Sequence, residues 1–534
     1  MAATIQVFIV LLIAISAASV VALRLQIPPA ILLVIAGVVL ALVPGLPTVK
    51  LNPEFVLLFV LPPIIYSSAV AMSWQDFKFN LRPISLLAIG CVLFTAVATA
   101  AVSHWLLGFS WPVGFVLGAI VSPPDAVAPL SIARRMLLPR RFLVILEGEG
   151  LANDASALIL YRFAITAVSL GVFSLSHATG TFAAIIGGEI LWGLGVGWAM
   201  LRLRRWVQDP RIEIMLSVLT PFLAYWPPEQ LGGSGVLATV TTGLYISWNG
   251  LRLISAATRL QGIFFWDFLI YLTEGFLFLI TGLQARTLIG GIHGYSVANL
   301  VVSALIVCIV VIGARFVWMF PATYLPRWLI PSVARDDPSP PWQWPVALAF
   351  TGVRGIVSLA AALAIPLTTS SGEPFPDRDR ILFLTFSVIL VTLVGQGLML
   401  PAVMRALGFA HAGRRERHAD RMEELSARRH SIESASHYLD ELVSERKLPE
   451  SIVHPLKSRY RDRLRVVDRF ERSSGDLKRT IKLDDEIECL LLAKERQQIN
   501  DLYRAGKLKD EPRRRIEREL DLRDAQLLNL RAED

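Results

Sequence analysis

Residues 118–128 read GAIVSPPDAVA, an apolar helical run that two adjacent prolines interrupt just before an aspartate. A proline lacks a backbone N–H and clashes with the preceding turn, so we expect the helix to break at Pro123 and Pro124. Helix breaks inside a membrane are tolerated only where protein or a water-filled cavity satisfies the freed backbone groups. This stretch therefore predicts a membrane helix that is broken at an internal polar site.

A second interruption lies late in the chain, where residues 351–355 read TGVRG inside another apolar segment. Gly352 and Gly355 loosen a helix because glycine loses more backbone freedom on folding than any other residue. Paired interrupted segments in the two halves of a chain point to an inverted-repeat transporter with a site near the bilayer midplane. We therefore expect an all-α, polytopic membrane protein of this type.

Charge divides the chain into two parts. Residues 1–409 carry 23 Lys and Arg with 17 Asp and Glu, whereas residues 410–534 carry 29 and 27. Because a spanning helix needs about 20 apolar residues, the first part has room for about a dozen spans. We predict a transmembrane domain at 1–409 and a charged, helical, water-soluble domain at 410–534.

Hydropathy predicts thirteen spans, and basic residues in the loops predict their orientation. One set of alternate loops holds 15 Lys and Arg, and the other set holds four. Since Lys and Arg accumulate in short cytoplasmic loops, we expect a cell (inner) membrane protein with its N-terminus outside and its C-terminus in the cytoplasm. The predicted spans lie near residues 3–23, 28–43, 53–72, 84–107, 112–132, 142–170, 179–201, 212–226, 235–247, 262–283, 296–320, 344–366 and 380–407.

Three carboxylates and an asparagine occupy one apolar segment, EGEGLAND at residues 147–154. An ionised side chain at the bilayer centre costs about 2.5–3.5 kcal/mol on insertion scales, so such residues usually line ion or proton pathways. Asp154 is therefore the leading candidate for the transported-ion site, and Asn153 supplies an amide that can orient or neutralise its charge. For Asp125 two interpretations stay open: ion coordination, and capping of the N–H groups that the helix break exposes.

Other charged groups in the apolar segments need partners. Arg354 is a buried cation, and we expect a structural ion pair with Glu149 or, failing that, with Glu147. Packing against polar neighbours is the expectation for Glu189 and Glu274, which we do not assign to the ion site. The three cysteines are too far apart for a disulfide framework or a metal site.

Five motifs follow one another across the predicted membrane domain. They are LPPIIY at 61–66, GAIVSPPDAVA at 118–128, EGEGLAND at 147–154, ITGLQ at 280–284 and GVRG at 352–355. In this order they resemble the NhaP/NHE branch of the monovalent cation:proton antiporters, the sodium/proton exchangers. Five motifs in the family's order make the resemblance specific, although the charged tail lies outside it.

The resemblance implies a bacterial-type, 13-helix, homodimeric carrier of NhaA-like fold, with a dimerisation domain and a six-helix core whose two broken helices cross near the ion site. Asn153 and Asp154 match the family's Asn-Asp pair, in which the aspartate binds the cation or a proton. Asp125 matches the aspartate of the broken-helix motif. Arg354 and Glu149 match the family's buried arginine and glutamate.

The chain departs from the family pattern at three positions. Many members carry an acidic residue where Ser67 stands, a threonine where Pro124 stands and a serine where Gly150 stands, so side-chain oxygens are lost here. We then expect the cation to use backbone carbonyls freed by the helix breaks, Ser122, Ser67 or water. Na⁺ is the expected cation, and broad K⁺(Na⁺)/H⁺ exchange at a larger, softer site is the alternative.

The expected function is secondary transport, not enzyme catalysis: a monovalent cation and H⁺ compete for Asp154, and alternating access exchanges them in the service of pH homeostasis. If Asp154 is the only titrating ligand, exchange is electroneutral. A cation channel would share the polar pathway. An intramembrane aspartyl protease would also use two aspartates, although Asp125 and Asp154 lack the Gly-x-Gly-Asp context of such enzymes. We expect membrane lipid and a second copy of the chain as partners, with no cofactor and no nucleic acid.

Overall fold

The computed structural model describes residues 2–43, 51–170, 175–207, 209–250, 253–290, 296–446, 449–471, 475–505 and 507–532. In this part of the chain all regular structure is helical, apart from one isolated bridge between Thr368 and Pro374. The predicted all-α class is confirmed.

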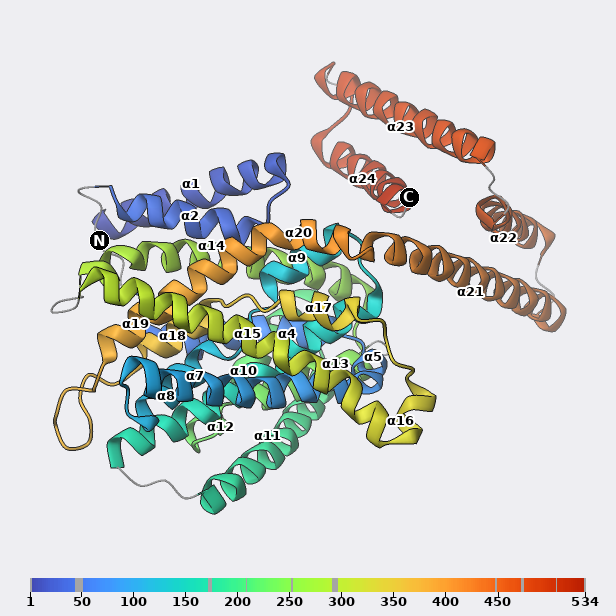
Figure 1. The fold of residues 1–534 in the computed structure, drawn as a ribbon. Helices are drawn as coiled ribbons and strands as arrows, with labels where there is room; N and C mark the ends of the chain where they lie inside the picture. Colours follow the sequence, from blue (N-terminus) through green and yellow to red (C-terminus); the bar gives the residue numbers. More distant parts are fainter. Residues whose placement is uncertain are drawn as a thin grey trace. The chain divides into compact units, whose positions relative to one another are not determined.

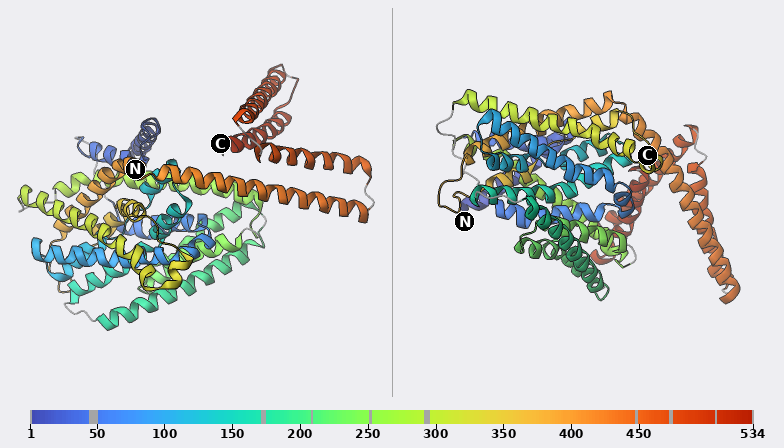
Figure 2. Two further views of the ribbon diagram at one scale, coloured as in Figure 1. Left: turned by 45° about the vertical axis from the view of Figure 1, so that its right-hand side comes forward. Right: turned by 60° about the horizontal axis from the view of Figure 1, so that its bottom comes forward.

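The chain forms two compact units, residues 1–414 and 415–534. The first unit is a bundle of long helices (Figures 1 and 2). Its first half contains α1 (Ala2–Leu25), α2 (Pro29–Ala41), α3 (Pro53–Phe55), η1 (Val56–Val60), α4 (Leu61–Ala71), α5 (Trp74–Phe79), α6 (Leu81–Ser85), η2 (Leu86–Cys91), α7 (Val92–Leu107), α8 (Trp111–Val121), α9 (Val127–Arg135) and α10 (Arg140–Leu170). Its second half contains α11 (Leu175–Arg204), α12 (Pro210–Gln230), α13 (Val236–Gly250), α14 (Ala256–Gly290), α15 (Val297–Leu329), α16 (Pro331–Asp336), α17 (Gln343–Phe350), α18 (Ile356–Leu363), α19 (Arg378–Leu390), η3 (Val391–Gln396) and α20 (Gly397–Ala406).

Each of the thirteen predicted spans coincides with one of these helices or with consecutive ones. Among the described residues, eight helices are long and apolar enough to cross a membrane, and α2 and α8 are shorter apolar helices. These helices confirm a polytopic membrane protein, while the number of thirteen crossings stays a prediction.

Both interrupted segments are broken in the structure. The first break separates α8, which ends at Val121, from α9, which begins at Val127. The second separates α17, which ends at Phe350, from α18, which begins at Ile356. The residues between the helices therefore expose backbone groups that need partners from elsewhere in the protein.

Close helix contacts in the bundle depend on glycine. A Cβ on Gly37 of α2 would lie 2.9 Å from the Cα of Gly282 on α14, and a Cβ on Gly118 of α8 would lie 3.0 Å from the Cα of Ala96 on α7. Small residues let membrane helices approach closely, because packing rather than the hydrophobic effect drives their association. Two of the five motifs, those with Gly118 and Gly282, therefore contribute helix contacts.

The buried carboxylate of Glu189, on α11, caps the start of α13. It accepts hydrogen bonds from the N–H groups of Ser234 at 2.6 Å, Gly235 at 3.2 Å and Leu237 at 3.1 Å. The first N–H groups of a helix have no partner within the helix, and they attract negative charge. This is the polar packing expected for Glu189.

Three arginines from three helices converge on Asp337, in the loop after α16. Arg141 of α10 donates to its two carboxylate oxygens at 2.8 and 2.9 Å, Arg327 of α15 donates at 2.7 Å, and Arg82 of α6 donates as well. Burial raises the pKa of Asp337, but the hydrogen bonds from Arg141 and the charges of the three arginines outweigh it and hold the pKa below its ordinary value. This carboxylate therefore ties α6, α10 and α15 together.

The second unit consists of helices that pair through narrow apolar stripes. Leu425 and Ile432 pack with Val467, and Leu492 packs with Leu520. These residues belong to α21 (Phe409–Arg446), α22 (Glu450–Glu471), α23 (Gly475–Arg504) and α24 (Asp510–Ala532). The tail is helical, as the sequence predicts.

Replacing Asp337 removes the acceptor that three arginines share. We expect Asp337→Asn to destabilise the protein by about 1.5–3 kcal/mol, the usual range for hydrogen bonds to charged groups, and to lower its melting temperature in detergent. Because folding lowers the pKa of Asp337, its stabilisation is fully present above the pKa of the unfolded chain and is lost only as the pH falls below that pKa. The difference in melting temperature between the wild type and Asp337→Asn should therefore be constant between about pH 5 and 8.

The exposed neighbour Asp336 provides the matched control, Asp336→Asn, which should melt like the wild type. An unchanged melting temperature in Asp337→Asn, or a difference that disappears at neutral pH, would contradict this account of the three arginines.

Candidate functional site

The two helix breaks lie against each other. The backbone N–H of Asp125, in the first break, donates to the carbonyl of Val353, in the second, at 2.7 Å. Each break therefore satisfies a backbone group that the other exposes, as burial at membrane depth requires.

Arg354 closes the same junction with its side chain. Its buried guanidinium donates from Nε to the carbonyl of Val121 at 2.8 Å and from Nη2 to that of Ser122 at 3.2 Å. Its Nη1 donates to the carbonyl of Gly352. Val121 and Ser122 form the C-terminal end of α8, where carbonyls lack helical partners and the helix dipole is negative. Arg354 is therefore held by the backbone of the two breaks.

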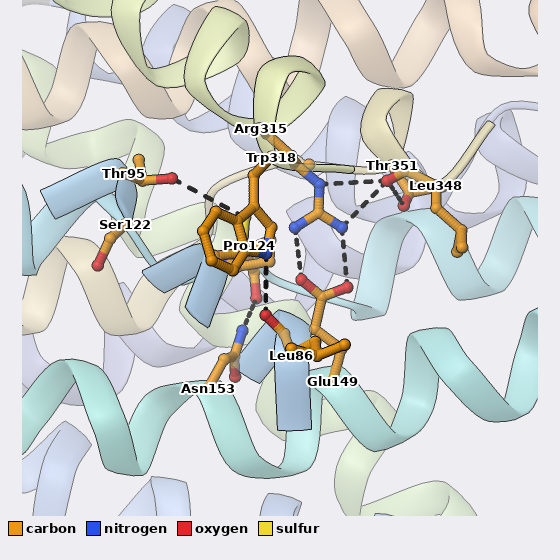
Figure 3. Close-up of polar contacts among 12 residues, drawn as sticks. Leu86, Thr95, Ser122, Pro124, Glu149, Asn153, Arg315, Trp318, Leu348 and Thr351 are labelled. Atoms are coloured by element: carbon orange, nitrogen blue, oxygen red, sulfur yellow. Dashed lines mark hydrogen bonds and ion pairs between the residues drawn. The ribbon is translucent and has the colours of Figure 1, made fainter. Parts of the chain in front are cut away.

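Asn153 joins α10 to the first break. Its Nδ2 donates to the carbonyl of Pro124 at 2.6 Å, a contact drawn in Figure 3. Its Oδ1 is buried and has no hydrogen-bond partner among the described residues. The amide therefore fixes this turn of α10, and with it Asp154, beside the broken helix.

Asp154 lines a cavity of about 150 Å³ together with three other carboxylates, those of Asp125, Glu147 and Glu274. Pro123, Pro124 and Gly355 complete its wall at the two breaks. Arg134 also lines the cavity, and its side chain is 63% exposed, so the cavity reaches the surface near the end of α9. No salt bridge joins Asp154 to any residue in the described ranges.

Asp125 caps α9 and also lines the cavity. Its Oδ1 accepts from the N–H of Val127, the first residue of α9, at 3.1 Å, which is a capping contact. The same side chain lines the cavity. Its carboxylate lies directly against Gly355, where any Cβ would collide with it. Capping is therefore present and is compatible with a place in the cavity wall.

The buried glutamate Glu149 pairs with Arg315, and the predicted pair with Arg354 is wrong. Arg315 Nη2 donates to Glu149 Oε2 at 2.8 Å and Nη1 donates to Oε1, in the bidentate geometry that arginine favours (Figure 3). Arg315 Nε also donates to the carbonyl of Leu348 at 3.1 Å. The prediction failed because Arg315 lies on α15, far along the chain in an apolar helix outside the five motifs, and nothing in its neighbourhood indicates its partner.

Two predicted ion ligands lie outside the lining of the Asp154 cavity. Ser67 of α4 lines a different cavity, whereas its neighbour Ser68 lines that of Asp154. The hydroxyl of Ser122 donates to the carbonyl of Ala119 at 3.2 Å, back along α8. Neighbouring positions on a helix face different directions, and a motif match does not tell whether Ser67 or Ser68 faces the cavity.

Glu274 of α14 is the cavity residue that sequence reasoning missed. It lies seven residues before Thr281 of the ITGLQ motif. Positions seven apart share a helix face, so this spacing could have placed Glu274 on the same face as the motif. Glu147, at the mouth of the cavity, pairs with Arg134.

An ion pair joins α10 to α12 on the C-terminal side of Asp154, whereas Glu147 and its partner Arg134 lie on the N-terminal side. Arg162 of α10 donates to Glu229 of α12. Their side chains are 34% and 20% exposed. This contact connects the helix that carries Asp154 to a helix outside the two broken segments.

Comparison with known proteins gives a family. The family described as sodium/hydrogen exchanger, transmembrane, matches residues 8–406. An uncharacterized Na⁺/H⁺ exchanger of Mycobacterium tuberculosis is 35% identical over 512 residues, which cover 95% of this chain and 93% of that protein. The sodium, potassium, lithium and rubidium/H⁺ antiporter of Bacillus subtilis is 32% identical over 387 residues, which cover 70% of this chain and 57% of that protein.

The fold has a counterpart among solved structures. The sodium proton antiporter MjNhaP1 of Methanocaldococcus jannaschii matches with a TM-score of 0.59 and 19% sequence identity, covering 76% of this chain and 99% of that chain. The NhaP-type antiporter fold expected from the motifs is confirmed. The family match spans all five motifs and most of the membrane unit, and the chain belongs to the sodium/hydrogen exchanger family.

Proposed function

We propose that this protein exchanges a monovalent cation for H⁺ across the cell membrane, and that Na⁺ is the main cation. The two ions compete for Asp154. One observation carries the proposal: Asp154 lies in a cavity that two broken helices border and that reaches the surface. A cavity of about 150 Å³ holds several water molecules. An ion can therefore approach the carboxylate without crossing packed side chains.

Few protein oxygens remain for the cation. Arg354 and Asn153 already engage four carbonyls at the breaks, so the breaks offer fewer free carbonyls than their sequence suggests. Asp154 becomes the main protein ligand, and water completes the shell.

Competition at one carboxylate is enough to couple the two ions. Asp154 is neutral when it holds either a monovalent cation or a proton, whereas the bare anion is charged. A buried, unpaired charge costs several kcal/mol, so both loaded forms reorient and the empty one does not. With Asp154 as the only titrating ligand, one cation exchanges for one proton and no net charge moves.

Alternating access requires the cavity to close on one side before it opens on the other. The cavity reaches the surface near Arg134, one of the 15 Lys and Arg that predict the cytoplasmic side. In this proposal the cavity is therefore open to the cytoplasm. The Arg162–Glu229 pair holds α10 against α12 on the opposite side. Outward opening separates this pair as a core that includes α10 moves against the helices of a homodimer interface.

Broader exchange that includes K⁺ is the second candidate. The Bacillus subtilis relative is named for sodium, potassium, lithium and rubidium. A site poor in protein oxygens, with Ser67 turned away and Pro124 and Gly150 offering no side-chain oxygen, suits a larger cation that keeps part of its water. Exchange assays with Na⁺, K⁺ and Li⁺ separate the two candidates.

We also propose a role for each of the two parts of the chain. Residues 1–409 carry transport, with the N-terminus outside, and residues 410–534 form a cytoplasmic helical domain. The exchange serves pH homeostasis.

Removing the titrating group should abolish exchange. In proteoliposomes with an internal pH dye and a voltage clamped by ionophore, an inward Na⁺ gradient should alkalinise the lumen with wild-type protein, and Asp154→Asn should give the signal of protein-free liposomes. Asp267→Asn, which makes the same change at an exposed acid of α14, should match the wild type. Activity in Asp154→Asn, or a wild-type signal that disappears when the voltage is clamped, would refute the exchange mechanism.

A second acid beside the first should make transport electrogenic. Asn153→Asp adds a titrating group next to Asp154, so we expect a transport current on a supported membrane that the wild type lacks. Asn153→Ala is the control: it removes the contact with Pro124 without adding a charge, and we expect slower but electroneutral exchange. Equal currents for wild type and Asn153→Asp would count against a single titrating ligand.

The Glu149–Arg315 pair is proposed as a structural element. Arg315→Gln leaves a buried, unpaired carboxylate, and breaking such a pair costs about 3–5 kcal/mol, so the melting temperature should fall strongly. Adding Glu149→Gln should recover much of this loss. If Glu149→Gln instead rescues Arg354→Gln and does not rescue Arg315→Gln, the assigned pairing is incorrect.

A further inference from the structure

A second large cavity lies in the membrane unit, away from the ion site. It has a volume of about 750 Å³ and is lined by residues of α4, α5, α11, α12, α13 and α14. Ligand sites usually measure about 300–1,000 Å³. Neither Asp154 nor Asp125 lines it, so cation exchange does not explain it.

Two buried charged side chains line this cavity, and each has one polar atom without a hydrogen-bond partner among the described residues. Arg204 is 4% exposed and Glu213 is 3% exposed. Arg204 donates from Nη2 to the hydroxyls of Tyr66 and Thr220 at 3.4 Å in both cases, and its Nε has no partner among the described residues. In the same described part, Oε2 of Glu213 also has none. Unsatisfied buried charges are costly, so a ligand that bonds both would be bound strongly.

The rest of the cavity is suited to an apolar body. Trp74, Trp248 and Trp266 line it, and tryptophan gathers at the depth where lipid headgroups meet the hydrocarbon. A neighbouring cavity of about 620 Å³ also has Trp74 and Trp248 in its wall and is otherwise lined mainly by apolar side chains. A charged pocket beside an apolar chamber matches an amphiphile.

We propose that these two cavities bind one aminophospholipid, of the phosphatidylethanolamine class. Its phosphate accepts from Arg204, its primary ammonium donates to Glu213, and an acyl chain occupies the apolar cavity. One buried cation and one buried anion match a zwitterion, whereas an anionic headgroup would leave Glu213 unpaired next to negative charge. A quaternary ammonium has no N–H to donate, so phosphatidylcholine cannot satisfy the carboxylate in this way.

The test measures lipid binding to the full-length, delipidated protein in detergent by native mass spectrometry. Dioleoyl phosphatidylethanolamine should bind about tenfold more tightly than dioleoyl phosphatidylcholine or phosphatidylglycerol, because only it satisfies both charges. Glu213→Gln should abolish the preference over phosphatidylcholine, and Arg204→Gln should weaken all three lipids. Arg202→Gln, at an exposed position on the same helix, should keep the wild-type ranking.

The wild-type ranking of the three lipids tests the proposal even if a variant fails to fold. Equal affinities overturn it, as does a preference for phosphatidylcholine. Tighter binding of phosphatidylglycerol would mark a site for anionic lipid and would also overturn the zwitterion assignment. In a folded Glu213→Gln protein, an unchanged preference for phosphatidylethanolamine refutes the role of this carboxylate.

Discussion

The structure depends on one constraint: backbone groups that are freed by broken helices inside a membrane must find partners within the protein. The two breaks satisfy each other's backbone groups. The N–H of Asp125 in the first donates to the carbonyl of Val353 in the second, and Arg354 donates to carbonyls of both. Asn153 adds the bond that attaches α10 to the first break. Without this mutual satisfaction neither break would be stable, and the cavity between them would not exist.

This solution decides which charges remain free for function. Arg354 is used to satisfy helix ends, and the buried pair of Glu149 and Arg315 neutralises itself. No cation pairs with Asp154 in the ranges that the structure describes. In the proposed mechanism the transported cation or the proton neutralises Asp154, because no protein cation does so. The interactions that stabilise the breaks therefore also leave this carboxylate free for exchange.

Sequence reasoning recovered the parts that have a local signature. The prolines before Asp125 and the glycines on either side of Arg354 mark two helix breaks, and the Asn153–Asp154 pair stands out because membrane helices rarely carry acids. It failed where the answer depends on distant partners or on helical phase. Arg315 pairs with Glu149 across a sequence separation of 166 residues, Ser67 lies one position before the residue that lines the cavity, and Glu274 lines the cavity from α14.

The most direct test of the central claim is the number of protons that leave the protein when a cation binds. Calorimetry of Na⁺ binding to purified protein, in buffers of different ionisation enthalpy, measures this number without any transport step. Competition at Asp154 predicts that close to one proton is released per Na⁺ bound at a pH where Asp154 is protonated, and that Asp154→Asn releases none. Na⁺ binding to the wild type without proton release at any pH would contradict it.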